Sequence, residues 1–323
     1  MIICSASRRH LLLAGTIGTL AVAVWPAAAQ QTPASPEAPP PWAQGRPETA
    51  IGAKLAPIAP PPLPTAADKL PIAKLKVPKG FKIEVYASGL ANARSLRQGD
   101  KGTVFVGSRI LDKVYAINDQ GGRREVKTLY SGLYRPNGLA FDKQMNLYVT
   151  DSFTGAIWRI PWGGSAQVWL QDPALTGDGS LGLFLGANGI AYRNGLFTVT
   201  NTERRSVVQI PKIGGQPGPI SVLTNLPPGD NPDGVAMDVH GDAFIAMNLQ
   251  NAIGEVHPDG SLDVVASGDP LDFPSSIAFG TARGGRTKLY GVNFSIGELF
   301  GLPPGPGPGV FWLAAGVPGF PVP

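Results

Sequence analysis

One structural unit recurs five times along the chain, and this repetition constrains the fold more than any other feature of the sequence. Each copy has a turn, an apolar strand, a tight turn and a second strand that ends in a polar residue. Equivalent positions in the five copies are Ser95, Gly138, Gly189, Gly234 and Ser276. Their spacings of 43, 51, 45 and 42 residues match one four-stranded blade of a β-propeller.

The three central copies are the most regular, because each begins with an Asn-Gly or Asp-Gly pair at Asn137, Asn188 or Asp233. Each copy also carries an outer pair of strands joined by a Gly-containing turn, and no long stretch has a helical period. The sequence therefore predicts an all-β domain, a β-propeller with five legible repeats and with five or six blades. A sixth blade would need a degenerate copy near a terminus or within residues 173–186.

A further strand is expected at residues 81–86, before the first copy. Its pattern resembles the outermost strand of a blade. Pairing this strand with the last blade would close the ring and remove exposed sheet edges, so we expect it to act as a clasp.

The N-terminus predicts export. Arg8 and Arg9 precede an uncharged stretch over residues 11–24, and three alanines ending at Ala29 follow, which is the order of a secretory signal peptide. The apolar run is too short for a permanent membrane anchor. We expect residues 1–29 to be removed near Ala29 and the mature protein to reach the periplasm, by the general or the twin-arginine route.

Composition separates a linker from the folded domain. Residues 30–79 are dominated by Pro and Ala and offer few apolar residues to bury, which predicts an extended tether before a propeller domain at residues 80–323. The only cysteine, Cys4, lies in the predicted signal peptide, so the mature chain has no disulfide.

Charge argues against a nucleic-acid partner. Without Arg8 and Arg9, 25 of the 27 basic residues remain against 23 acidic residues. The mature chain contains no run of basic residues that could bind along the phosphate backbone of a nucleic acid. We therefore expect a small-molecule substrate, with a protein partner under the non-catalytic alternative below.

Polar residues recur at the turns that should meet at one mouth of the central channel. The turn into the innermost strand and the turn after the second strand open on the same face of a propeller. The expected residues are Asn137, Asn188 and Asp233 from the first set of turns, and Asp151, Asn201, Asn248 and Asn293 from the second. Their oxygens suit a calcium-like ion, although Asn and Asp before Gly also form turns for purely local reasons.

Two runs, residues 187–190 and 231–238, resemble the gluconolactonase, senescence-marker and luciferin-regenerating enzyme family. Its members are six-bladed propellers with one divalent metal in the channel. The resemblance implies a calcium, zinc or manganese ion held by Asn188 and Asp233, and hydrolysis of a lactone or related sugar-like ester with Asp233 as the catalytic base. It also implies that Arg135 and Asn137 bind the substrate, because they match an Arg-x-Asn pair of the family.

The chain departs from that family at its first inner strand. The family supplies a metal-binding Glu there, whereas this chain has Arg94 and no acid. If Arg94 points inward, its permanent charge opposes a cation and can instead receive an anionic group of the substrate. Arg94 is therefore a third candidate substrate-binding residue.

Two alternatives to a hydrolase remain open. Residues 78–90 and 100–108 resemble the opening of sorbosone dehydrogenase-like propellers, which use pyrroloquinoline quinone. That chemistry would need a histidine in the channel, and His240 and His257 are both expected in turns elsewhere. Propellers of the NHL type share the same turns without catalysis, so a non-catalytic binding or scaffold protein is the stronger alternative.

Overall fold

A computed structural model describes residues 66–70, 72–74, 84–99, 101–108, 111–133, 135–281 and 284–321. The predicted signal peptide lies outside these residues. Two short 3-10 helices, η1 (Ala67–Lys69) and η2 (Ile72–Lys74), fall within the segment predicted to be a linker. None of the helices in the described residues combines the length and the apolar composition that a membrane-spanning helix needs.

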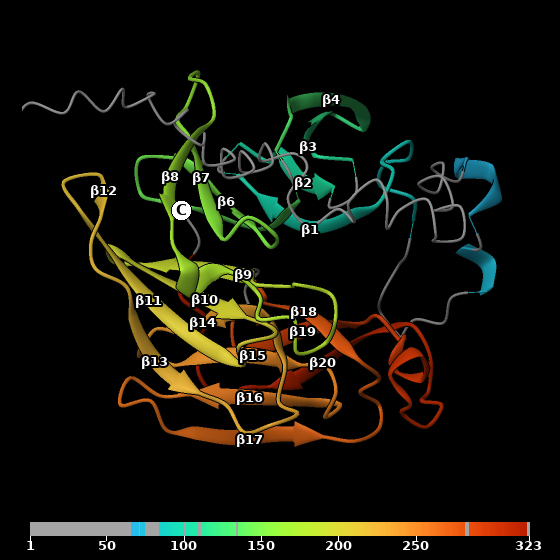
Figure 1. Cartoon of the computed structure of the whole chain (residues 1–323). Helices are drawn as coiled ribbons and strands as arrows, with labels where there is room; N and C mark the ends of the chain where they lie inside the picture. The colour runs from blue at the N-terminus through green and yellow to red at the C-terminus, as the bar shows by residue number, and fades with distance from the viewer. Residues whose placement is uncertain are drawn as a thin grey trace, which may run out of the picture. The chain divides into compact units, whose positions relative to one another are not determined.

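Five antiparallel sheets follow one another along the chain and form the blades of a β-propeller (Figure 1, teal to red). Blade 1 contains β1 (Ala93–Gln98), β2 (Val104–Ser108), β3 (Lys113–Gln120) and β4 (Arg123–Ser131). Blade 2 contains β5 (Pro136–Phe141), β6 (Leu147–Asp151), β7 (Ala156–Ile160) and β8 (Gln167–Gln171). The all-β propeller that the repeats predict is confirmed.

The remaining blades keep the same strand order with small variations. Blade 3 contains β9 (Ala187–Arg193), β10 (Leu196–Asn201), β11 (Ser206–Ile213) and β13 (Ser221–Asn225), with the short β12 (Gln216–Pro217) paired to the end of β11. Blade 4 contains β14 (Pro232–Met237), β15 (Ala243–Met247), β16 (Ala252–Val256) and β17 (Leu262–Ser267). Blade 5 contains β18 (Pro274–Phe279), β19 (Lys288–Asn293) and β20 (Gly309–Ala314).

The described residues thus form five blades, and residues 173–186 do not hide a sixth. That segment contains the 3-10 helix η3 (Pro173–Leu175), followed by turns. A short helix η4 (Gly297–Phe300) lies between β19 and β20.

The predicted clasp at residues 81–86 is not seen in the described residues. Glu84 and Tyr86 lie in no strand, while residues 81–83 are outside the description. Arg124 of β4 donates to the Glu84 carboxylate at 3.2 Å and stacks over the Tyr86 ring at 4.0 Å. This segment therefore contacts the first blade, and β20 is the outermost described strand of the last blade.

The core lies between neighbouring blades. Every residue of β5, β6, β14 and β15 is buried, because both faces of these strands are covered. Between blades 2 and 3, the ring of Phe197 lies 4.4 Å from that of Tyr148 and 5.2 Å from that of Trp169. Aromatic contacts of this kind contribute to the packing of one blade against the next.

A β-bulge near one end of every inner strand prepares the functional site. In β5, for example, Pro136 pairs with Asp151 but Leu139 pairs with Val149, so the inner strand holds one extra residue. Corresponding register shifts occur in β1, β9, β14 and β18. A bulge bends its strand and redirects one side chain. Here it affects the second residue of each inner strand.

Glycine is required directly after that second residue in the central blades. A Cβ atom on Gly138 would lie 2.4 Å from the backbone oxygen of Asn188, and one on Gly189 would lie 2.5 Å from the oxygen of Asp233. The inner strands of successive blades thus approach too closely for any side chain. This explains the Asn-Gly and Asp-Gly pairs that mark the repeats.

Candidate functional site

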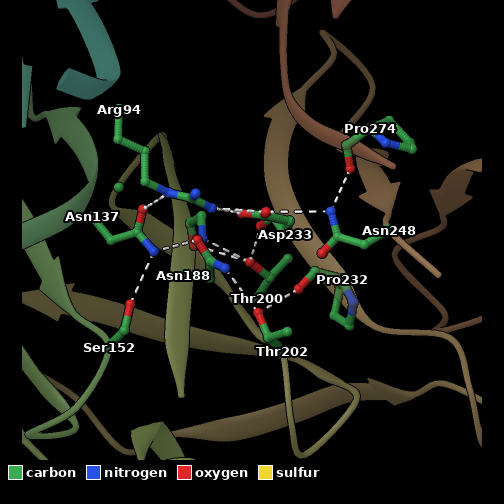
Figure 2. Close-up of polar contacts among 12 residues, drawn as sticks. Arg94, Asn137, Ser152, Asn188, Thr200, Thr202, Pro232, Asp233, Asn248 and Pro274 are labelled. Carbon is green, nitrogen blue, oxygen red and sulfur yellow. Dashed lines mark hydrogen bonds and ion pairs between the residues drawn. The ribbon is translucent and has the colours of Figure 1, made fainter. Parts of the chain in front are cut away.

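The second residues of the five inner strands gather at one mouth of the channel. They are Arg94, Asn137, Asn188, Asp233 and Ser275, and we call them the inner ring. Arg94, Asn188, Asp233 and Ser275 line a small cavity of about 100 Å³. Figure 2 shows Arg94, Asn137, Asn188 and Asp233 turned toward one another. The structure thus brings Asn137, Asn188 and Asp233 together, and it turns Arg94 inward toward them.

Arg94 is the centre of the inner ring. Its Nη2 lies 2.8 Å from both carboxylate oxygens of Asp233, and its Nε donates to Asn137 Oδ1 at 2.7 Å (Figure 2). The Arg94 side chain is 17% exposed and that of Asp233 is 7% exposed, so water screens the ion pair only weakly. One side chain from blade 1 thereby connects blade 2 with blade 4.

The two amides of the inner ring continue this network. Asn137 Nδ2 donates to Asn188 Oδ1 at 2.5 Å and to Ser152 Oγ at 2.9 Å. Asn188 Nδ2 donates to Thr202 Oγ1 at 2.8 Å. In both side chains Oδ1 accepts a hydrogen bond and Nδ2 donates one, so the network determines the orientation of each amide group.

Three polar residues support the inner ring from behind, and we call Ser152, Thr202 and Asn248 the latch residues. Each follows the second strand of its blade and donates to the carbonyl of the first inner-strand residue in the next blade. The acceptors are Ala187 at 2.7 Å, Pro232 at 2.8 Å and Pro274 at 2.5 Å. Asn248 Nδ2 also lies 3.3 Å from Asp233 Oδ2. The latches join blades 2 to 3, 3 to 4 and 4 to 5.

The second predicted set of mouth residues is wrong except for Asn248. The buried Asp151 accepts from the backbone N–H groups of Phe153 and Thr154, each at 3.2 Å, and burial raises the pKa of its carboxyl. Asn201 and Asn293 likewise bond to backbone groups of nearby loops. Asp151 and Asn201 directly precede the latch residues Ser152 and Thr202, and Asn293 holds the equivalent position at the end of β19. Successive residues of a strand point in opposite directions.

Arg135 lies beside the inner ring without joining its hydrogen bonds among the described residues. It directly precedes β5 on the same face, and its guanidinium is 4.7 Å from the centre of the Phe153 ring. This places a cation over an aromatic face at the rim. Its predicted contact with a substrate remains a prediction.

A loop at residues 172–186 enters on the same face. Glu203 is fully buried, and its carboxylate accepts from the backbone N–H of Gly179 at 2.7 Å and of Leu183 at 3.0 Å. Glu203 therefore holds the loop in place from its buried position. The loop leaves Leu183 and Phe184 exposed, so the rim combines apolar and charged groups.

The inner ring does not fit a divalent metal. Both oxygens of Asp233 accept from Arg94, and the oxygens of Asn137 and Asn188 accept from Arg94 and Asn137 respectively. The guanidinium, a permanent cation, contacts the oxygens that a metal would need. Arg94 points inward, and its positive charge opposes a cation at this place, as the sequence indicates for that case.

A second group of potential metal ligands lies at the other end of blade 4. Asp242, Glu255 and His257 bring ligand atoms within 4.8 Å of one another. Hydrogen bonds to Asp242 and then Asp263 raise the pKa of His257 to about 9, so this imidazole is protonated at neutral pH. His240 lies in the β14–β15 turn at the same end, where its backbone N–H donates to Asp238. As predicted, neither of these two histidines contacts the inner ring.

Comparisons with solved structures place the fold. A protein assigned as a gluconolactonase superposes with a TM-score of 0.54 at 16% identity, covering 71% of this chain and 76% of its own. The luciferin-regenerating enzyme gives 0.53 at 17%, with 71% and 80% covered. A gluconolactonase from Xanthomonas campestris gives 0.50 at 16%, with 62% and 69% covered.

These structures show that the chain shares the propeller fold of the proteins that its sequence motifs resemble. No protein-family model matches the sequence, and a search of curated proteins finds no match.

Proposed function

We propose that the protein is a lactonase-like hydrolase that works in the periplasm on a small lactone or related sugar-like ester. The observation that carries the proposal is the Arg94–Asp233 pair, which sets a positive group and a carboxylate side by side at the mouth of the channel. Fold similarity to two gluconolactonases and the luciferin-regenerating enzyme supports this choice among hydrolases. Export rests on the signal-like segment that ends near Ala29.

In this proposal Arg94 supplies the positive charge. Its Nε and Nη2 are engaged by Asn137 and Asp233, while its Nη1 makes no hydrogen bond to a described residue. The carbonyl oxygen of the ester would accept from Nη1, which stabilises the negative charge that develops there. The amide network holds the guanidinium plane in place for that contact.

Asp233 serves as the base. A water molecule attacks the carbonyl carbon while Asp233 accepts its proton, and a tetrahedral intermediate forms. The bond between the carbonyl carbon and the ring oxygen then breaks, and the leaving oxygen takes the proton from Asp233. The product is a hydroxy acid, and Arg135 at the rim would contact the hydroxyl groups of the substrate.

The divalent ion implied by the family resemblance has no part in these steps. Calcium, zinc or manganese could reach Asn188 and Asp233 only after the Arg94 guanidinium moved away. The proposal therefore expects hydrolysis that is insensitive to a chelator such as EDTA.

A non-catalytic binding or scaffold propeller is the second candidate. It is favoured by the extensive internal hydrogen bonding of the inner ring and by the small volume of its cavity, about 100 Å³. Under this alternative the inner ring only joins the blades.

A lactone panel assayed with and without EDTA separates the two candidates. We expect hydrolysis of at least one lactone, unchanged by EDTA, and a loss of about 100-fold in kcat for Asp233→Asn, in which the base is gone. Asp263→Asn, which alters an exposed carboxylate at the other end of blade 4, is the matched control. If the folded wild-type protein hydrolyses no lactone, the lactonase proposal is wrong and the non-catalytic binding or scaffold propeller remains.

A further inference from the structure

The channel widens at the end opposite the inner ring. A cavity of about 800 Å³ is lined there by the later residues of β1, β5, β9, β14 and β18 and by the C-terminal segment. Its volume lies within the range of about 300–1,000 Å³ that is usual for small-molecule sites. This cavity is distinct from the inner ring in position and in chemistry.

Most of the side chains that line this cavity are apolar. Aromatic and aliphatic lining residues include Phe141, Tyr192, Met237, Phe279 and Phe320. Backbone hydrogen bonds hold the C-terminal part of the wall, since the N–H of Phe320 donates to Met237 O at 2.8 Å and that of Gly319 donates to Arg286 O at 3.0 Å. The wall is therefore part of the fold and offers a ready surface for an apolar body.

One cation stands at the inner end of the cavity. Arg97 of β1 lines both this cavity and the small cavity beneath the inner ring, and its Nε donates to Leu139 O at 3.0 Å. Burial lowers the pKa of Arg97, yet a guanidinium remains charged at neutral pH. Its Nη1 and Nη2 make no hydrogen bond or ion pair with a described residue.

The described residues of the wall contain no acid that could neutralise Arg97. A second cation, the exposed Arg286, also belongs to the lining. A half-buried charge without a counterion is costly, and an anionic ligand would relieve that cost. Apolar walls around an inner cation are the features that recognise an amphipathic anion.

We propose that this cavity binds a small organic carboxylate with an apolar body, whose carboxylate meets Arg97 and whose body packs against the aromatic wall. The site needs no catalysis at the inner ring, because it lies at the other end of the channel. Failure of the lactonase proposal would leave it untouched.

Calorimetric titration of the folded protein with octanoate and with octan-1-ol tests the proposal, since the two probes share an alkyl chain and differ in charge. We expect octanoate to bind at one site, about tenfold tighter than octan-1-ol. Arg97→Gln should abolish that preference. Arg123→Gln, which removes an exposed arginine at the start of β4, is the matched control and should keep it.

Two further variants keep the test decisive if Arg97→Gln fails to fold. Gln98→Glu adds a negative charge to the exposed lining and should weaken octanoate while leaving octan-1-ol unchanged. Ala278→Trp fills the cavity and should weaken both probes. Equal binding of octanoate and octan-1-ol, no binding of either, or wild-type affinity for octanoate in Gln98→Glu would each overturn the proposal.

Discussion

The junctions among blades 2 to 5 differ from the junction between blades 1 and 2. At the former, Gly138, Gly189 and Gly234 let the next inner strand approach so closely that an added Cβ would lie 2.4, 2.5 and 2.8 Å from its backbone. In blade 1 the equivalent residue is Ser95. At the junction of blade 1 with blade 2, a Cβ atom added to Gly107 of β2 would lie 3.2 Å from Asn137 O. Blade 1 therefore meets its neighbour less tightly.

Arg94 supplies a connection of another kind. Blades 2, 3 and 4 each carry a latch residue, while the equivalent position of blade 1, residue 109, lies outside the described residues. Arg94 instead reaches across the channel to Asp233 and sideways to Asn137. A charged side chain thus connects blade 1, which has Ser95 in place of the repeated glycine, and it does so at the proposed active site.

The largest effect is expected at a tight junction. Gly189→Ala should lower the free energy of unfolding by about 3 kcal/mol, because its Cβ would meet backbone atoms that cannot turn aside. Ser95→Ala puts the same residue at the equivalent position of blade 1 and should change stability by less than about 0.5 kcal/mol. Urea denaturation measures both. Equal effects of the two variants would show that the junctions do not differ in tightness.

Removing the charged connection should have the next largest effect. Arg94→Gln leaves Asp233 without its ion pair, and we expect a loss of about 2 kcal/mol. This figure lies below the cost of breaking a fully buried pair because Arg94 is 17% exposed. A double-mutant cycle with Asp233→Asn isolates the coupling between them. A coupling energy near zero would mean that Arg94 does not join blade 1 to blade 4.

A single latch should matter less. Thr202→Val removes the hydrogen bond to Pro232 O and leaves Asn188 Nδ2 without its acceptor, so we expect a loss of about 1.5 kcal/mol. Thr287→Val, at an exposed position, is the matched control and should be close to neutral. Thermal melting of both variants provides the comparison. An unchanged melting temperature for Thr202→Val would show that the latch residue does not stabilise the junction between blades 3 and 4.

Much of the fold follows from the sequence because the repeats encode it directly. The glycine of each Asn-Gly or Asp-Gly pair reports a close backbone approach, and the preceding polar residue falls on the bulge that faces the channel. These local signals located Asn137, Asn188 and Asp233. The sequence does not decide between five and six blades, because the repeats indicate five and the family resemblance implies six.

Other parts of the site could not be predicted because they depend on contacts between distant segments. Arg94 and Asp233 are 139 residues apart, and only the folded channel shows that their charges pair. The latch residues were missed by one position in two blades, which in a strand is enough to reverse the direction of a side chain. The sequence feature that indicates a latch residue is a Ser, Thr or Asn directly after the second strand of a blade.

The guanidinium of Arg94 takes the position that a metal would need in the inner ring. The most direct test of this arrangement is the melting temperature of wild type and of Arg94→Glu over a range of calcium, zinc and manganese concentrations. A metal that binds only the folded state raises the melting temperature as its concentration increases. We expect no rise for wild type and a clear rise for Arg94→Glu, in which a carboxylate joins Asp233 and Asn188. A rise for wild type that Asp233→Ala abolishes would contradict the account.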